Sequence, residues 1–229
     1  DYLSEHDSDS PRLDAEILLG HILGLERINL YVNINDEPSD EQKARFRELI
    51  KQRAAGAPVA YLVEEKEFFS IPLRVTPAVL IPRPETELLV LGAVDFARSR
   101  SSDTPLELCD VGTGSGAVSI AIAKNVKECS VTAVDISLDA LAVTKFNVAK
   151  HGLEDRIELI ESDVMESIAP ERTFDLVVSN PPYVTEAEMK ELPVDVGGYE
   201  PHTALSGGKD GLDVIRRLIS QSEKRLRPG

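Results

Sequence analysis

The second half of the chain alternates short apolar runs with longer stretches of helical periodicity. The runs are rich in β-branched residues and are bounded by turn residues, which is typical of buried strands. We expect strands at 106–111, 131–134, 157–160 and 174–178, and helices at 117–125 and 137–152. Strands that alternate with helices are joined by right-handed crossovers, which produce a parallel sheet covered on both faces. The pattern therefore predicts an α/β fold for this half of the chain.

The last expected strand runs directly into the sequence Ser179-Asn180-Pro181-Pro182-Tyr183. Two consecutive prolines cannot continue a sheet ladder, so this sequence is a rigid loop at the carboxyl end of a strand, where open α/β sheets bind ligands. Asn180 and Pro181 offer carbonyl acceptors, and Tyr183 offers a flat aromatic face. Together they suit a planar group that carries an NH2. A purely structural Asn-Pro turn is the alternative.

A glycine-rich turn follows the first expected strand. It consists of Gly112, Thr113, Gly114, Ser115 and Gly116. Glycines let the backbone turn sharply and approach a ligand closely, and the helix that follows offers free N–H groups. Ala117 stands where the dinucleotide-binding fingerprint requires its third glycine, so the spacing does not favour NAD. We expect the turn to contact a different bound ligand.

Acidic residues follow the next two expected strands. Asp135 ends the second strand, 21 residues after Gly114, where a carboxylate can accept both hydroxyls of a ribose. Asp163 and Val164 follow the third strand, and we expect them to contact the amino group and ring face of an adenine. An N-cap or turn role is the alternative for Asp163. Acids after successive strands are hard to explain by packing, so a ligand-binding edge is favoured.

The composition narrows the class of partner. The 229 residues include 40 acidic and 25 basic side chains, a formal net charge of −15, which disfavours an electrostatic hold on bare nucleic acid. No metal-ligand spacing surrounds Cys109 or Cys129, and the sequence has no long apolar run or signal-like start. We expect no metal site, no membrane segment and a reducing, cytoplasmic location. Because the first residue is Asp1, we expect a segment of a longer chain.

The region 1–56 is expected to form a separate helical domain. Ser10 and Pro11 supply an N-cap and a first-turn proline for one helix, and Ser39 with Gln42 has the spacing of a capping box for another. The region carries no reactive cluster. Its functional interpretation is a docking module for a macromolecular substrate.

Two segments join the helical region to the expected sheet. In 57–80, two short extended runs surround a charged turn at 64–66, which predicts a linking β-hairpin. The stretch 81–87, Ile-Pro-Arg-Pro-Glu-Thr-Glu, is a proline-stiffened entry to a helix, and its acids suit the positive end of that helix. The alternative is that Arg83 or Glu85 lines a cleft above the sheet.

The glycine turn, Asp135 and the Asn-Pro-Pro-Tyr sequence together resemble the class I S-adenosylmethionine-dependent methyltransferases that modify planar nitrogen. Nearly the whole chain resembles the release factor glutamine methyltransferases, the HemK or PrmC family. The stretches that carry this resemblance are Arg12-Leu13-Asp14-Ala15-Glu16 with Leu18-Leu19, 81–87, 110–116, 179–183, Tyr199-Glu200-Pro201, Thr203-Ala204-Leu205 and Gly207 through Leu212. Adenine methyltransferases share Asn-Pro-Pro-Tyr, but 81–87 and the helical amino-terminal region are more specific to this family.

The resemblance implies a Rossmann-like methyltransferase domain over 81–229, joined by the hairpin 57–80 to the helical domain 1–56. Two departures from the family affect this expectation. The family usually has a glycine in the linker hairpin where this chain has Glu64, which affects the turn but not the chemistry. The chain also ends at Gly229, whereas the family continues, so three strands of the usual seven-stranded sheet are expected to be missing.

The activity that the resemblance implies is N5-methylation of the glutamine in the Gly-Gly-Gln loop of class I peptide release factors. Gly112 to Gly116 and Asp135 would hold S-adenosylmethionine, Val164 would contact its adenine, and Asn180 to Tyr183 would hold the glutamine amide. An amide nitrogen is a poor nucleophile, and acceptors on both of its hydrogens would aim its lone pair and stabilise the developing charge. His202 is not expected to act as a general base, although its loop can close over the site. Adenine-N6 methylation of nucleic acid is the alternative function, which the acidic charge disfavours.

Overall fold

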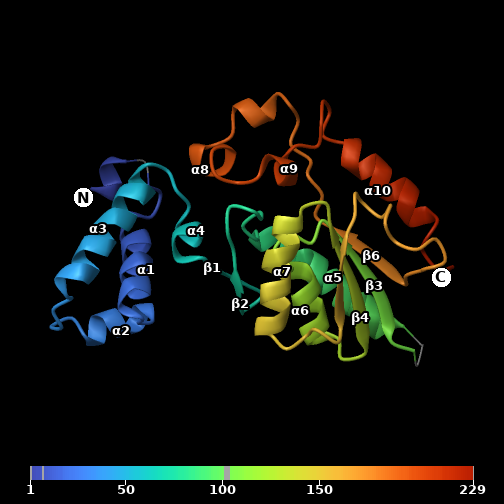
Figure 1. Cartoon of the computed structure of the whole chain (residues 1–229), viewed down its shortest axis with the longest axis horizontal. Coiled ribbons are helices and arrows are strands. Elements are labelled where there is room, and N and C mark those ends of the chain that lie inside the picture. The colour runs from blue at the N-terminus through green and yellow to red at the C-terminus, as the bar shows by residue number, and fades with distance from the viewer. Residues whose placement is uncertain (1, 7, 101–103, 229) are drawn as a thin grey trace. The chain divides into compact units, whose positions relative to one another are not determined.

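The computed structural model describes residues 2–6, 8–100 and 104–228. These residues form two compact units (Figure 1). The first unit holds the described residues up to Glu64 and the segment Pro193–Tyr199, and the second holds those from Glu65 to Leu192 and from Glu200 onward. None of the described helices is both long and apolar enough to cross a membrane.

The first unit is helical, as the sequence predicts. At the start of α3 the predicted capping box is present, because the N–H of Gln42 donates to Ser39 Oγ and the N–H of Ser39 donates to Gln42 Oε1. The Ser10 side chain, in contrast, makes no capping hydrogen bond at the start of α1. The hydroxyl of Tyr199 donates to the carbonyl of Ala55, which attaches the segment 193–199 to this unit. Its helices are η1 (Leu3–Glu5), α1 (Pro11–Leu23), α2 (Arg27–Val32), α3 (Asp40–Ala54), α4 (Val59–Val63) and α8 (Val194–Gly197).

The linker differs from its prediction. Residues 59–63 form the helix α4 and not an extended run. The prediction of a turn at 64–66 is also wrong, because a strand begins at Glu65. The hairpin lies later, where β1 (Glu65–Phe68) pairs antiparallel with β2 (Ile71–Arg74). Glu64 ends α4 with a φ of 53°, the left-handed conformation that glycine adopts at little cost. A glycine, which the family resemblance leads us to expect at this position, fits that conformation without strain.

The second unit is built on a parallel sheet of four strands in the order β5-β4-β3-β6, which confirms the predicted α/β fold. Val111 at the end of β3 pairs with Val134 of β4 and with Ser179 of β6, so the carboxyl ends of the strands lie along one edge. The strands are β3 (Leu106–Val111), β4 (Cys129–Asp135), β5 (Ile157–Glu161) and β6 (Leu176–Ser179). The helices are η2 (Pro84–Thr86), α5 (Glu87–Ser99), α6 (Ala117–Asn125), α7 (Leu138–Lys150), η3 (Glu188–Lys190), α9 (His202–Leu205) and α10 (Asp213–Glu223).

Each face of the sheet has its own core, because alternate residues of a strand point to opposite faces. Leu106 and Leu108 of β3 belong to a large cluster that includes buried residues of α5, α6 and α7. Cys109 and Val111 belong to a second cluster, against which Leu218 of α10 packs. The helices α5 to α7 therefore cover one face, and α10 covers part of the other.

A buried amide in α7 holds the glycine-rich turn in place. Asn147 is completely buried, and its Nδ2 donates to the carbonyls of Arg74 and Ser115 at 2.9 and 2.8 Å. Its Oδ1 accepts the N–H of Arg74 at 2.7 Å. One turn earlier, Thr144 Oγ1 donates to the carbonyl of Gly114 at 2.7 Å. The turn after β3 is thus fixed to α7, and through Asn147 to the hairpin strand β2.

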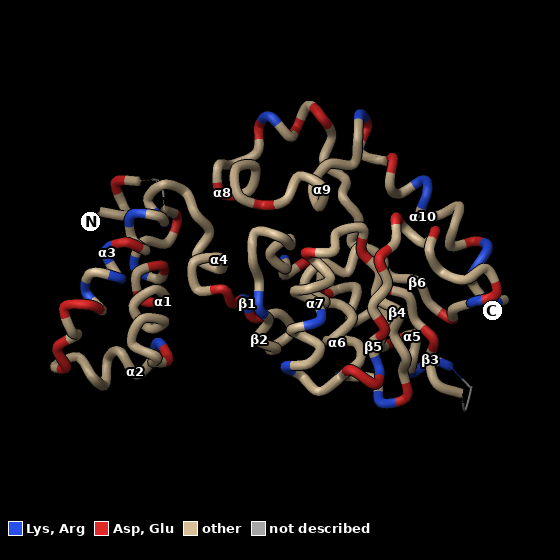
Figure 2. The backbone as a smooth tube through the Cα atoms, viewed as in Figure 1, with Lys and Arg blue, Asp and Glu red and all other residues tan. Residues whose placement is uncertain are grey.

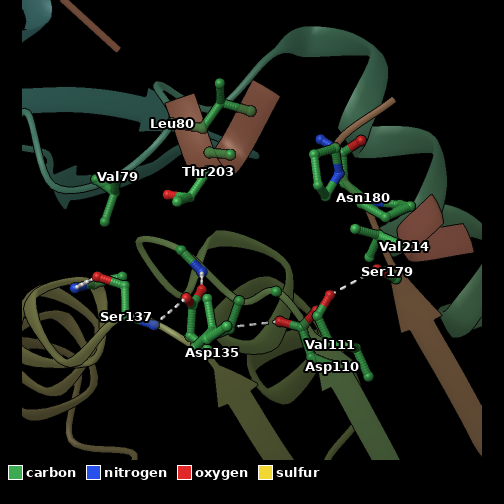
Figure 3. A pocket seen from close by; sticks show the side chains of 18 of the residues that line it. Val79, Leu80, Asp110, Val111, Asp135, Ser137, Ser179, Asn180, Thr203 and Val214 are labelled. Atoms are coloured by element: carbon green, nitrogen blue, oxygen red, sulfur yellow. Dashed lines mark hydrogen bonds between the residues drawn. The ribbon is translucent and has the colours of Figure 1, made fainter. Parts of the chain in front are cut away.

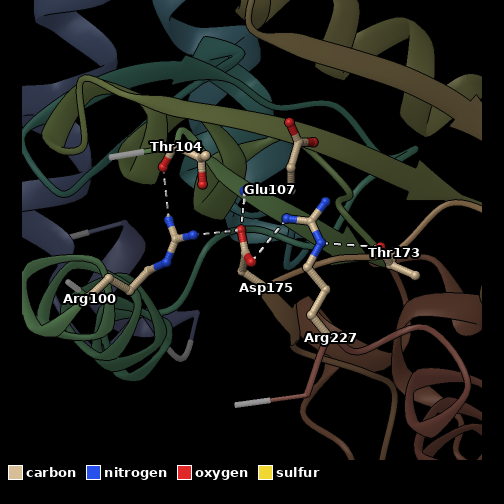
Figure 4. Close-up of polar contacts among 6 residues, drawn as sticks. All are labelled: Arg100, Thr104, Glu107, Thr173, Asp175 and Arg227. Atoms are coloured by element: carbon tan, nitrogen blue, oxygen red, sulfur yellow. Dashed lines mark hydrogen bonds and ion pairs between the residues drawn. The ribbon is translucent and has the colours of Figure 1, made fainter. Parts of the chain in front are cut away.

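A cluster of charges fixes the chain just before β6 (Figure 4). The Asp175 carboxylate, whose side chain is 11% exposed, pairs with Arg100 at 3.1 Å and with Arg227 at 3.0 Å. It also accepts the N–H of Glu107 in β3 at 2.9 Å. Burial raises the pKa of Asp175, but the hydrogen bonds from Glu107 and Arg227 outweigh it, and the pKa lies below the ordinary value. The cluster therefore stabilises the folded chain while Asp175 is ionised.

We expect Asn147→Ala to lower the free energy of unfolding by about 3 kcal/mol, because three buried backbone groups lose their partner. Urea unfolding measures the loss. The matched control is Asn125→Ala, which removes a single hydrogen bond to the Ala121 carbonyl at an exposed helix end and is expected to cost less than about 1 kcal/mol. Equal losses in the two variants would contradict a special role for Asn147.

We expect Asp175→Asn to lower the free energy of unfolding at pH 7 by about 1–3 kcal/mol, since two ion pairs lose their charge. Because the folded pKa is lowered, the carboxylate stabilises the protein above the ordinary pKa of about 4, and this contribution disappears as the pH falls through the lowered value. Unfolding of parent and variant across this pH range tests it. Asp210→Asn, which removes the charge from an exposed pair with Arg216, is the control and is expected to cost less than Asp175→Asn. A constant difference in the free energy of unfolding between parent and Asp175→Asn at every pH would refute the stabilising role of the Asp175 charge.

Candidate active site

A pocket of about 360 Å³ lies at the edge where the parallel strands end. Figure 3 shows Val79, Leu80 and Thr203 on one side of it, opposite Asp110 and Asp135. Turns after all four strands contribute to the lining: residues 112–115 after β3, 135–137 after β4, 162–164 after β5, and 179–182 at the end of β6. The structure thus brings together the strand ends that the sequence singled out.

Asp135 lies at the centre of the polar part of this pocket. One of its carboxylate oxygens accepts the N–H of Gly114 at 2.9 Å, and the other accepts the N–H of Ser137 at 3.0 Å. Each carboxylate oxygen can accept a second hydrogen bond, so both are suited to hydroxyl donors of a ligand. Asp135 therefore fixes the glycine-rich turn and presents acceptors to the pocket.

Asp110 is a pocket residue to which sequence reasoning gave no role. It stands just before the end of β3, is buried, and accepts hydrogen bonds from the hydroxyls of Thr113 at 2.8 Å and Ser119 at 2.6 Å. Burial raises the pKa of Asp110, although the two hydroxyl donors act in the opposite direction. An acid two residues before the first glycine of a glycine-rich turn is the sequence signal that could have identified it.

Gly116 is the one residue of the predicted glycine turn that does not line the pocket. Its φ is 79°, and a Cβ at this position would lie 2.8 Å from Cγ2 of Thr144. Glycine is therefore required here for packing of the turn against α7. By contrast, a Cβ on Gly112 or Gly114 would meet nothing within 4 Å, although both have positive φ.

Asp163 and Val164, which we expect to contact an adenine, both line the pocket. Asp163 also forms an ion pair of 2.7 Å with Arg217 of α10, which the sequence did not indicate. Val164 is buried and has a φ of 56°, an unfavourable conformation for a β-branched residue. Strained backbone of this kind is found at ligand sites, where the surrounding structure imposes it.

The loop after β6 presents two acceptors. Asn180, Pro181 and Pro182 line the pocket, whereas Tyr183 does not and is 64% exposed. Nδ2 of Asn180 donates to Oγ1 of Thr86 at 3.3 Å. Within the described part of the chain, neither Oδ1 of Asn180 nor the carbonyl of Pro181 accepts a hydrogen bond. Both oxygens are thus available to a donor in the pocket.

Two segments that are distant in sequence from the strand ends add to the lining. One is 78–86, of which Ala78, Val79, Leu80, Pro82 and Thr86 line the pocket, and the other contributes Pro201, Thr203, Ala204 and Ser206. Arg83, Glu85 and His202 are not in the lining. Arg83 instead forms an ion pair with Glu200. No group of three or more His, Cys, Asp or Glu residues within the described ranges is placed to hold a metal ion.

Two family models match parts of this chain. Residues 1–63 match the family described as "PrmC N-terminal domain", and residues 97–194 match "Methyltransferase small domain". Among solved structures, the 16S rRNA methyltransferase RsmC of T. Thermophilus, in complex with AdoMet and guanosine, has a TM-score of 0.52 at 22% identity, covering 72% of this chain and 39% of that one. At this identity the likeness shows the fold.

Two relatives resemble the chain along its whole length. The release factor glutamine methyltransferase of Rhodopirellula baltica is 49% identical over 230 aligned positions, which cover 100% of this chain and 78% of the relative. The enzyme of the same name from Koribacter versatilis is 41% identical over 228 residues, which cover 100% of this chain and 80% of that relative. The chain therefore belongs to the release factor glutamine methyltransferase family, whose members use a Rossmann-like S-adenosylmethionine-dependent methyltransferase domain.

Proposed function

We propose that this protein transfers a methyl group from S-adenosylmethionine to the side-chain nitrogen N5 of the glutamine in the Gly-Gly-Gln motif of class I peptide release factors. The observation that carries the proposal is the pair of available acceptors, Asn180 Oδ1 and the Pro181 carbonyl, beside a pocket with the carboxylate of Asp135. A primary amide has two N–H donors in one plane, and two neighbouring acceptors match them.

The pocket residues fit the cofactor. A volume of about 360 Å³ with a mostly apolar wall and a few polar groups suits a small ligand. Asp135 would accept the ribose hydroxyls, Val164 would contact the adenine ring, and the turn at 112–115 would approach the rest of the molecule. Asp163 would accept a hydrogen bond from the adenine amino group while it remains paired with Arg217, since a carboxylate accepts several hydrogen bonds.

The chain's own contribution to the reaction is orientation and electrostatics. S-adenosylmethionine supplies a methyl group that is already activated on a sulfonium centre. With both amide hydrogens accepted, by Asn180 and Pro181, the nitrogen lone pair is aimed into the pocket, and the positive charge that develops on nitrogen is stabilised. As the bond from nitrogen to the methyl carbon forms, the carbon–sulfur bond of the donor would break to leave a neutral thioether, and the methylated nitrogen would then release one proton to solvent. Pro182 stiffens the loop that carries these acceptors. Tyr183, exposed beside them, would contact the substrate segment with its ring.

The first unit is proposed to dock the release factor, and a cytoplasmic location follows from that partner. Direct binding of nucleic acid is not part of the proposal, because the formal net charge is −15 and basic positions are interspersed with acidic ones along the described backbone (Figure 2). The relatives do not favour the adenine methyltransferase alternative.

Mass spectrometry of a release factor, incubated with this protein and isotopically labelled S-adenosylmethionine, tests the proposed function. We expect one labelled methyl group on the glutamine of the Gly-Gly-Gln motif. A release factor with that glutamine replaced is the control, and labelled adenine in added nucleic acid without labelled glutamine would overturn the proposal.

We expect Asp135→Ala to weaken S-adenosylmethionine binding by about 1.5–3 kcal/mol, the range for charge-assisted hydrogen bonds. Calorimetry measures the change. Asp139→Ala removes the same charge from the exposed first turn of α7, outside the pocket lining, and is expected to bind like the parent. Unchanged affinity in Asp135→Ala would remove Asp135 from the cofactor site.

We expect Asn180→Ala to lower kcat by about 10²- to 10³-fold with a smaller effect on KM, because the contact strengthens in the transition state. Asn180→Asp keeps an acceptor of similar shape, so it should retain more activity than the alanine variant. Single-turnover methyl transfer to a release factor, with cofactor affinity checked for each variant, measures the effect. Transfer at the parent rate by Asn180→Ala would mean that this loop is only a turn.

A further inference from the structure

The side chain of Asn180 has two chemically opposite ends, and only one of them serves the proposed function. Its Oδ1 can accept an N–H of the substrate amide, whereas its Nδ2 can only donate. A rotation of the side-chain amide by half a turn would place Nδ2 against the substrate NH2, donor against donor. The substrate NH2 therefore favours the orientation that presents the oxygen, and an efficient reaction also requires that the Asn180 side chain be held in place.

The structure provides one contact that holds the amide in place. Nδ2 of Asn180 donates to Oγ1 of Thr86 at 3.3 Å, and it is the single hydrogen bond that the Asn180 side chain makes within the described ranges. A threonine hydroxyl can donate as well as accept, so this contact fixes the position of the side chain, and the substrate NH2 determines which end faces it. Thr86 is half-buried and lines the same pocket. With Nδ2 directed to Thr86, Oδ1 is left without a partner among the described residues.

Thr86 is itself held firmly. It ends the short helix η2, where its N–H donates to the carbonyl of Arg83 at 3.0 Å. Arg83 is tied by its ion pair to Glu200, whose side chain is 1% exposed. On the other side, the carboxylate of Glu87 accepts the N–H of Phe69 at 3.0 Å. The hydroxyl oxygen of Thr86 is thus held at a fixed position, on a segment that is anchored at both ends.

We propose that Thr86 is a positioning residue that holds the Asn180 side chain in place, with its oxygen towards the substrate glutamine. The proposal rests on the proposed function, which assigns Asn180 to the substrate amide. It gives the stretch 81–87 a role in catalysis, through Asn180, in addition to its role as the entry to α5. Thr86 makes no contact with the reacting atoms in this mechanism.

The kinetic test replaces the hydroxyl and keeps the shape. Thr86→Val is expected to lower kcat about 5- to 10-fold, the value of one hydrogen bond, with KM for the release factor and cofactor affinity within about twofold of the parent. Thr86→Ser retains the hydroxyl and is expected to stay within about twofold of the parent kcat. In the Asn180→Ala background, Thr86→Val should cause no further loss, because its effect acts through Asn180.

Thr173→Val is the matched control, since it removes a hydroxyl that accepts from Arg227 and lies outside the pocket lining. We expect it to leave kcat unchanged. Parent kcat in Thr86→Val would overturn the proposal. An equal loss in Thr86→Ser, or a full additional loss in the Asn180→Ala background, would overturn it as well, because each points to a general disturbance of the pocket.

A second readout does not depend on methyl transfer. The side-chain NH2 signal of Asn180 in the NMR spectrum, assigned by its absence in Asn180→Ala, is expected to move and broaden in Thr86→Val but not in Thr86→Ser or Thr173→Val. An unchanged signal in Thr86→Val would overturn the contact itself. If Thr86→Val shows the expected NMR change but the parent protein methylates no release factor, the proposed function is refuted and the contact between Thr86 and Asn180 is not.

Discussion

Parallel pairing of four strands is the constraint on which the pocket depends. Because Val111 pairs with both Val134 and Ser179, the three strand ends stand side by side, although Ser179 follows Val111 by 68 residues in the sequence. A shift of one residue in either pairing would turn the side chains to the opposite face of the sheet. The separate cores on the two faces resist such a shift, since each is filled by alternate residues of β3.

Polar side chains fix the turns and connecting segments whose positions the strand register does not determine. Asp175 ties the chain before β6 to Arg100 and Arg227, while Asn147 and Thr144 attach the turn after β3 to α7. Each of these groups satisfies partners that would be costly to leave unpaired in the interior. The glycine-rich turn and the loop after β6 are therefore held at fixed positions before a ligand arrives, as electrostatic preorganisation requires.

The sequence predicted the sheet, and most of the residues that it singled out for a site line one pocket, because these signals are local. Strand ends, the glycine turn and the Pro181–Pro182 pair are visible in short windows, and the parallel sheet then places them together. The helix α4 was missed because its residues, Val-Ala-Tyr-Leu-Val, are as apolar and β-branched as a strand, and only packing decides between the two. The pairing of Asp163 with Arg217 and the contact of Thr86 with Asn180 join residues far apart, which no local pattern reports.

Backbone strain also has a pattern that local sequence does not reveal. Among the described residues, four that are not glycine have positive φ, and three of them, Glu64, Phe69 and Ser70, flank the first hairpin strand. None of these three positions holds glycine, asparagine or aspartate, the residues that adopt a positive φ most readily. Phe68 of the same hairpin is almost fully buried in the main core, and this burial offsets the cost of the strained backbone. The fourth is Val164, in the pocket. Tertiary packing therefore imposes strain at two places, the hairpin that follows the first unit and the wall assigned to the cofactor, and such positions persist only where the surroundings over-determine them.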